Sequence, residues 1–265
     1  MTTAMKESKS DSGVTLVTGG ASGMGLLLAG KLAAAGDKVA IADVNPVPPG
    51  DAIAADDSVT SFICDLSDHE ATARLVEEIS GSLGAVTRLI HCAAIMPGGD
   101  LSDMDAAQIT RVMAINYMGT VNVTKAVLPG MLARDSGDIV IIGSMAGSVL
   151  THGLGAYCAS KSATNTFVEV LQHENRDNNV QIMLVCPPMV NTPLVEQAVA
   201  GGPKSLGLAK STNRMASPES IVDAIIDGLE KGASTVTPGE AAFMMWLRRF
   251  SPSLLWWIMR RANSR

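Results

Sequence analysis

Short runs of almost continuous apolar residues alternate along the chain with longer stretches in which apolar positions recur at helical spacing. The short runs lack polar alternation, which is typical of strands covered by helices on both faces, and hence of a parallel sheet. Seven strands are predicted, at residues 14–19, 38–43, 59–65, 86–94, 137–144, 180–188 and 234–239.

Helices are predicted at about 23–35, 67–84, 105–133, 155–175 and 217–232. Ser67 is expected to open the second of them, with Asp68 and Glu70 in its first turn, where acids suit the helix dipole. Three prolines make a full helix unfavourable in 45–58, so that crossover should be irregular. The alternation predicts an α/β Rossmann fold, with a doubly wound, mostly parallel seven-stranded sheet and helices on both faces.

We expect one catalytic domain at 13–240, preceded by a flexible tail at 1–12 and followed by a hydrophobic and basic helical extension at 241–265. The net charge of −6 argues against nucleic acid as a partner. Four scattered cysteines indicate neither a metal site nor a disulfide framework, and fit a reducing cytoplasm. Neither a secretory signal nor a spanning apolar run is recognised.

The sequence TGGASGMG at 18–25 joins the first strand to the first helix. Gly19, Gly23 and Gly25 suit a tight turn that brings backbone amides and a helix N-terminus to a pyrophosphate. Asp43 ends the second strand, where a carboxylate would bind an adenosine ribose and repel a 2′-phosphate. Because neither the glycine loop nor the residues just after Asp43 supply a Lys or Arg, NAD is favoured over NADP as the cofactor.

The glycine loop, combined with Tyr157-x-x-x-Lys161, resembles the short-chain dehydrogenase/reductase family in its compact single-domain form, from about residue 13 to 237. The resemblance implies a catalytic serine at Ser144 and a catalytic asparagine at Asn116, which would hold a water for proton relay. Positions 157 and 161 share a helix face, so the Lys161 ammonium, aided by the positive nicotinamide of NAD, should lower the pKa of the Tyr157 phenol. Tyr157 would then act as general base and acid, while Ser144 binds the substrate oxygen.

The glycine loop and the resemblance together imply a set of cofactor-binding residues. They are Gly19, Ser22, Gly23, Met24, Gly25, Asp43, Asp65, Leu66, Ala93, Tyr157, Lys161, Pro187, Val190 and Thr192. Two segments depart from the family pattern. HCAA at 91–94 replaces Asn-Asn-Ala-Gly and should lose side-chain hydrogen bonds that support the sheet, and Pro187-Pro188 replaces Pro-Gly and should stiffen its turn. His91, His152 and His173 are interpreted as structural or surface residues, and Cys158 as a packing residue.

Apolar side chains flank the expected site and form the predicted substrate pocket: Met96, Met145, Leu150, Met189 and Leu194. The loop at 193–216 is expected to be mobile and to close over the substrate. All three tryptophans lie in 241–265, which carries five arginines and no acid and should form two short helices. Three roles stay open for 241–262, namely a pocket wall, a subunit interface or a peripheral membrane contact.

These features predict an NAD-dependent enzyme that interconverts a lipophilic secondary alcohol and its ketone. An NADPH-linked ketoreductase is the alternative within the same chemistry. A dinucleotide-binding, membrane-associated regulator without turnover is the alternative from another class. The family resemblance implies a homo-oligomer, either a tetramer or a dimer. We expect a cytoplasmic protein, and whether it also associates peripherally with a membrane stays open.

Overall fold

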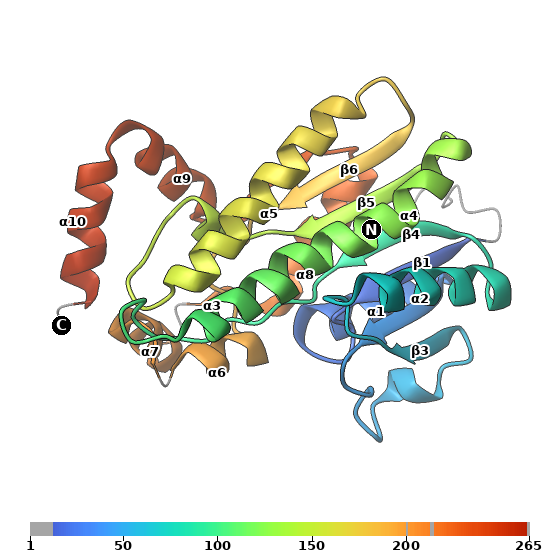
Figure 1. Cartoon of the computed structure of the whole chain (residues 1–265), viewed down its shortest axis with the longest axis horizontal. Coiled ribbons are helices and arrows are strands. Elements are labelled where there is room, and N and C mark those ends of the chain that lie inside the picture. Colours follow the sequence, from blue (N-terminus) through green and yellow to red (C-terminus); the bar gives the residue numbers. More distant parts are fainter. Residues whose placement is uncertain (1–12, 200, 213–214, 264–265) are drawn as a thin grey trace, which may run out of the picture.

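The computed structural model describes residues 13–199, 201–212 and 215–263, and the predicted tail at 1–12 lies outside them. Seven parallel strands form one sheet in the order β3-β2-β1-β4-β5-β6-β7 (Figure 1). The strands are β1 (Val14–Thr18), β2 (Lys38–Asp43), β3 (Val59–Ile63), β4 (Val86–His91), β5 (Gly137–Ile142), β6 (Val180–Val185) and β7 (Thr235–Val236). The predicted doubly wound Rossmann fold is confirmed.

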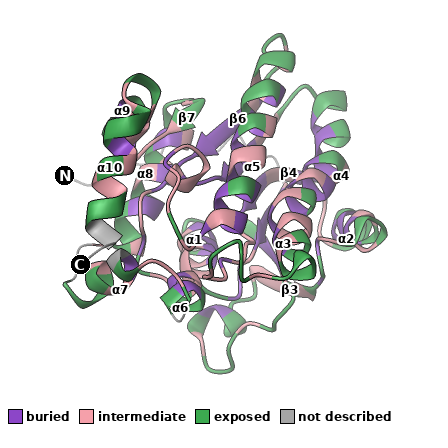
Figure 2. Cartoon of the chain, turned by 60° about the vertical axis from the view of Figure 1, so that its left-hand side comes forward, coloured by how far each residue is buried: buried purple, intermediate pink, exposed green. Residues whose placement is uncertain are grey.

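Helices cover both faces of the sheet, which explains why its strands are apolar throughout. On one face α2 (His69–Ser82), α4 (Gly119–Ala133) and α5 (Gly155–Glu174) pack against the central strands. On the other face lie α1 (Gly23–Ala34) and α8 (Pro218–Glu230). Figure 2 shows the strands between these layers as buried and the outer helix surfaces as exposed.

Several predicted boundaries were wrong by one to three residues. The helix α2 begins at His69 rather than Ser67, because the carboxylate of Asp68 caps it by accepting a hydrogen bond from the amide of Ala71 at 2.9 Å. The strand predicted to reach residue 94 ends at His91, and its apolar continuation lines a cavity instead. The irregular crossover contains only a 3₁₀ turn, η1 (Ala52–Ala55).

The predicted helical stretch at 105–133 is interrupted. A π-helical turn, η2 (Ala114–Met118), separates α3 (Ala106–Met113) from α4, and Asn116 lies inside this turn, fully buried. Such turns insert an extra residue into the helical repeat and are frequent at functional sites.

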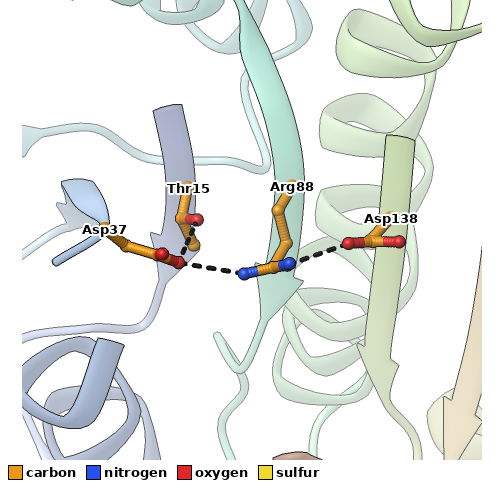
Figure 3. A network of polar contacts seen from close by, with 4 residues as sticks. All are labelled: Thr15, Asp37, Arg88 and Asp138. Atoms are coloured by element: carbon orange, nitrogen blue, oxygen red, sulfur yellow. Dashed lines mark hydrogen bonds and ion pairs between the residues drawn. The ribbon is translucent and has the colours of Figure 1, made fainter. Parts of the chain in front are cut away.

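A charged network joins three strands at their amino ends (Figure 3). From β4, Arg88 donates to Asp37 at 2.9 Å and to Asp138 of β5 at 3.0 Å. The hydroxyl of Thr15 in β1 donates to the same Asp37 carboxylate at 3.1 Å. This network lies at the edge of the sheet opposite to the glycine turn, so its role is structural.

The segment predicted as a mobile loop contains two short helices, α6 (Pro193–Val199) and α7 (Lys204–Ser211). As predicted, two helices follow the domain, α9 (Ala241–Phe250) and α10 (Pro252–Asn263), and they extend beyond the sheet on one side (Figure 1). They contact α7 and the 3₁₀ turn η3 (Met145–Gly147). In the described part of the chain, no helix is both long and apolar enough to cross a membrane.

Candidate active site

A cavity of about 440 Å³ lies at the carboxyl ends of β1, β2 and β4, beside the N-terminus of α1. Gly19 bends the chain into the turn with φ +65°, and a Cβ there would lie 2.6 Å from the amide nitrogen of Ala93. A Cβ on Gly25 would lie 2.2 Å from the carbonyl oxygen of Gly19. The close packing therefore requires glycine at both positions, and it leaves the helix N-terminus facing the cavity.

Asp43 lines this cavity at the end of β2. One of its carboxylate oxygens accepts a hydrogen bond from the amide of Ala21 at 3.2 Å, and the other accepts from the amide of Asn45 at 3.0 Å. These bonds hold the carboxylate at the rim of the glycine turn. Arg111 of α3 carries the one positive charge among the described residues that line the cavity.

The cavity brings together ten of the predicted cofactor-binding residues: Gly19, Ser22, Gly23, Met24, Gly25, Asp43, Asp65, Leu66, Ala93 and Thr192. Four others are not part of its lining, and these are Tyr157, Lys161, Pro187 and Val190. The carbonyl of Pro187 accepts a hydrogen bond from the amide of Met145, and Val190 forms a β-bridge with Ala216.

Sequence reasoning missed several lining residues, among them Asn45, Cys92, Ile95, Arg111, Ile115 and Gln197. Asn45 and Cys92 follow strand ends, which is a signal that could have been used. The residues from α3, η2 and α6 could not be found in this way, because only the tertiary fold brings those elements to the cavity.

Beside this cavity, α5 and the end of β5 position the catalytic candidates. Tyr157 and Lys161 are both buried, one turn apart on α5. The Lys161 Nζ donates to the carbonyl of Ile142 at 2.7 Å and lies 6.0 Å from the centre of the Tyr157 ring. Ser144 follows β5, its hydroxyl accepts a hydrogen bond from the amide of Ala146 at 3.0 Å, and it lies close enough to Tyr157 to lower the pKa of the phenol. The three side chains thus meet at the carboxyl end of the sheet.

The pKa values differ from the sequence prediction. Burial raises the pKa of Tyr157 to about 12, an effect larger than the opposing hydrogen bond from Ser144. Burial also lowers the pKa of Lys161 to about 8. In the protein without bound cofactor, burial therefore moves the pKa of Tyr157 in the direction opposite to the lowering expected from Lys161 together with the positive nicotinamide of NAD.

Asn116 connects the loop after β4, which lines the cavity, to α5, which carries Tyr157 and Lys161. Its side-chain oxygen accepts from the amide of Ile95 at 2.8 Å, and its nitrogen donates to the carbonyl of Ile95 and to the hydroxyl of Ser160, both at 2.9 Å. The Ser160 hydroxyl in turn donates to the carbonyl of Tyr157 at 2.8 Å. The π-turn therefore fixes the loop after β4 against the catalytic helix.

His91, which stands where the family pattern has asparagine, makes side-chain hydrogen bonds that support the sheet. Its ring nitrogens contact the hydroxyls of Thr18 at 2.7 Å and Thr120 at 2.9 Å, and Thr120 also donates to the carbonyl of Asn116 at 2.7 Å. The expectation that this segment loses its side-chain hydrogen bonds is wrong at His91, because the imidazole bridges β1 and α4. The interpretation of His91 as a structural residue agrees with these contacts.

Four of the predicted substrate-pocket residues share one apolar cluster with Tyr157. They are Met96, Leu150, Met189 and Leu194. The fifth, Met145, packs in a neighbouring cluster with Val149, Leu247 and Leu255, against the C-terminal helices. Cys158 is buried in the first cluster, in agreement with a packing role. The side chains that pack with Tyr157 in this cluster are apolar.

Comparisons with known proteins identify the family of the chain. The family model described as short chain dehydrogenase matches residues 13–201. The chain is 30% identical to epidermal retinol dehydrogenase 2 of Homo sapiens over 90% of this chain and 78% of that one. It is 32% identical to 2-(S)-hydroxypropyl-CoM dehydrogenase 3 of Xanthobacter autotrophicus, over 84% and 92%. A short chain dehydrogenase/reductase from Burkholderia phymatum, solved in complex with NAD, superposes with a TM-score of 0.80 at 24% identity, covering 92% and 95%.

The chain belongs to the short-chain dehydrogenase/reductase family, whose oxidoreductases use NAD or NADP. The residues present fit such a dinucleotide. The glycine turn leaves a cradle that a Cβ would fill, and a Cβ on Gly23 would approach Thr192 and Pro193 to 3.6 Å across the cavity. The anchored carboxylate of Asp43 faces the same space.

Proposed function

We propose that the protein is an NAD(H)-dependent oxidoreductase that interconverts a lipophilic secondary alcohol and its ketone. The observation that carries this proposal is the buried Ser144, Tyr157 and Lys161 set, hydrogen-bonded at the end of β5 beside a cavity that fits a dinucleotide. The four free cysteines fit a reducing cytoplasm as its location.

The glycine turn and Asp43 would hold the pyrophosphate and the ribose of the cofactor, and Thr192 would contact its nicotinamide end. The chemistry supplied by NAD, when bound, is the acceptance of a hydride from the carbinol carbon and its return in the reverse direction. Ser144 donates a hydrogen bond to the substrate oxygen and so orients it beside the phenol.

Tyr157 exchanges the proton of the substrate hydroxyl. In the oxidation the phenolate oxygen takes this proton, and in the reduction the phenol returns it. Because burial raises the pKa of Tyr157 to about 12, the phenolate needs positive charge nearby, and Lys161 is the cation on the same helix face. Asn116 keeps the α5 backbone at Tyr157 in register through Ser160.

The apolar side chains that pack with Tyr157 support the substrate class. Met96, Leu154 and Val195 are buried around Tyr157, and Met189 and Leu194 pack against them. An apolar pocket of this kind stabilises a hydrocarbon body and leaves only the reacting oxygen to be bound by polar groups. Two relatives in the same family carry names that refer to the oxidation of retinol and of a 2-hydroxypropyl group.

One observation favours the alternative of an NADPH-linked ketoreductase. Arg111 lines the cavity and could bind a 2′-phosphate, whereas Asp43 would repel it. We give Asp43 more weight than Arg111 in choosing the cofactor, because backbone amides anchor the Asp43 carboxylate at the end of β2, where the adenosine ribose would bind. A regulator without turnover is disfavoured by the complete catalytic set.

The test titrates the purified protein with NADH and with NADPH, followed by an assay with a panel of secondary alcohols. We expect tighter NADH binding, and we expect Asp43→Ser to weaken it roughly tenfold or more, the value of a charged hydrogen bond. Tyr157→Phe should lower turnover by roughly 10²–10⁴ without weakening cofactor binding. Tyr117→Phe serves as the matched control, because Tyr117 contacts Phe167 instead.

Equal or reversed affinities for the two cofactors would overturn the assignment of NAD. Binding of either cofactor with no turnover on any alcohol or ketone would favour the regulator.

A further inference from the structure

Five large apolar side chains lie exposed on the C-terminal helices, and we call them the outer aromatic face. Their exposed fractions run from 46% to 66%. They are Phe243, Trp246, Phe250, Leu254 and Trp257. The spacing of the first three places them on one side of α9, where Phe243 stacks on Trp246 at 6.2 Å and Trp246 contacts Phe250 at 5.1 Å.

The opposite side of the same helices is buried and fixes their orientation. Leu247 of α9 and Leu255 of α10 pack with Val149 of the loop after β5, and α10 also contacts α7. The aromatic side chains are therefore held outward by packing, and the helices project from the side of the molecule (Figures 1 and 2). Clustered exposed aromatics of this size mark an interaction surface.

Arginines lie in the last turn of each helix that carries the outer aromatic face. Arg248 and Arg249 end α9, and Arg260 and Arg261 lie in the last turn of α10, with the Arg261 guanidinium 5.5 Å from the ring centre of Trp257. The segment 241–265 carries five arginines and no acid, while the whole chain carries −6. This segment therefore has a net positive charge, although the whole chain is acidic.

We propose that the outer aromatic face docks the protein onto the surface of an anionic lipid bilayer. Tryptophan and phenylalanine partition into the headgroup boundary, and the arginines add electrostatic attraction to anionic lipids. An anionic bilayer offers both an apolar boundary for the aromatic side chains and negative charge for the arginines. The contact is peripheral, since neither α9 nor α10 meets the length and hydropathy needed to span.

A second copy of the chain suits this surface less well. A two-fold contact places identical surfaces together, so the arginines of both segments would share one interface with no acid from either segment to neutralise them. Other exposed apolar side chains, Met118, Leu132 and Val170, lie on η2, α4 and α5 and offer a separate place for subunit contact.

Docking would set the bilayer beside the proposed substrate pocket. The inner side of the two helices packs on Met145 and Val149, in the loop that begins at Ser144. A lipid-dissolved substrate would then reach the pocket without crossing water. The docking itself does not depend on the proposed oxidoreductase function.

The test is flotation of the full chain with vesicles of phosphatidylcholine alone and of phosphatidylcholine mixed with phosphatidylglycerol. We expect binding to the anionic vesicles, release at high salt, and a blue shift of tryptophan emission on binding. The variant F243S/W246S/F250S should lose binding, whereas Ile63→Ser, which removes an equally exposed apolar side chain from β3, should keep it.

A second variant, R248Q/R249Q/R260Q, keeps the aromatic face and tests the charge. Its partition onto anionic vesicles should fall on the order of a hundredfold, at roughly fivefold for each arginine. No vesicle binding by the wild type would overturn the proposal. It would also be overturned if the aromatic variant bound vesicles normally and instead lost oligomer mass in light scattering, which would assign the surface to a second copy. NADH binding measured in parallel tests the proposed function separately.

Discussion

At the scale of single residues, His91 is held in one protonation state by its neighbours. The Thr120 hydroxyl donates its hydrogen bond to the carbonyl of Asn116. Its oxygen must therefore accept a hydrogen bond from Nε2–H of His91. The other ring nitrogen, Nδ1, then accepts from the hydroxyl of Thr18. Burial, with a smaller contribution from the Lys161 charge, lowers the pKa of His91 from 6.5 to about 3, so the imidazole stays neutral.

This neutral histidine should make the protein sensitive to acid. As the pH falls from 6.5 toward 3, the unfolded chain binds a proton at His91 and the folded chain does not, so the free energy of unfolding falls. The expected loss from this group is about 1.4 kcal/mol per pH unit. His91→Asn should lack this component, which denaturant unfolding at several pH values would measure.

The matched control is His173→Asn, because His173 is exposed near the end of α5. It should keep the pH dependence of the wild type. If His91→Asn lost stability with acid as steeply as the wild type, the neutral bridge would be refuted.

The residue scale also separates what the sequence could and could not predict. The glycine loop and Tyr157-x-x-x-Lys161 together carry the family resemblance, and that resemblance implies Ser144. Helix geometry adds that positions 157 and 161 share one face. The raised pKa of Tyr157 could not be predicted in the same way. It depends on how many residues from elsewhere in the chain exclude water from the phenol, and spacing does not encode that number.

At the scale of elements, backbone contact between glycines docks α6 and α7 over the site. A Cβ on Gly98 would lie 2.4 Å from the amide nitrogen of Gly202 and 2.5 Å from the carbonyl oxygen of Ala198. The Gln197 side chain accepts a hydrogen bond from the amide of Met96 at 3.0 Å. The segment that lines the cavity through Thr192 and Gln197 is thus fixed to the loop after β4.

Gly98→Ala should therefore push α6 and α7 away from the site. We expect faster hydrogen exchange of amides in 193–211 and a rise in KM and in the Kd of NADH, each roughly tenfold, since a small displacement of positioned groups costs about this much or more. Gly207→Ala is the matched control, because its Cβ would meet open space on α7. Similar exchange in both variants would show that the glycine contact does not hold the segment.

Element order was predictable here and element ends were not. Cys92, Ala93 and Ala94 continue the apolar pattern of β4, although the chain has already turned into the cavity wall. The π-turn at Ala114–Met118 has no signal in hydrophobic period, because one extra residue in a long helix only rotates the apolar stripe. Its cause is tertiary, in the bonds that Asn116 makes to Ile95 and Ser160.

At the scale of the whole molecule, stability and function are assigned to opposite edges of one sheet. The cavity and the proposed catalytic residues lie at the carboxyl ends of the strands, where open parallel sheets bind their ligands. The amino ends are joined by Arg88, which bridges Asp37 and Asp138 with side chains only 12% to 27% exposed. A change at the amino edge should alter folding without altering the site.

Arg88→Leu keeps the aliphatic packing of the side chain and leaves two half-buried carboxylates without their cation. We expect a loss of about 1–3 kcal/mol in the free energy of unfolding, below the value for a fully buried pair because water still reaches these groups. Calorimetry should show a fall in Tm of about 2–4 °C for each kcal/mol.

Arg74→Leu is the control, since Arg74 and its partner Glu70 are 65% and 82% exposed and separated by 3.5 Å. Its stability should change by no more than about 0.5 kcal/mol. Both variants should bind NADH with the wild-type Kd, because neither residue lines the cavity. If the two variants were equally stable, the cross-strand network would contribute no more than an ordinary surface ion pair. If Arg88→Leu weakened NADH binding while folded, the two edges of the sheet would be coupled, and the division between a stabilising edge and a reactive edge would fail.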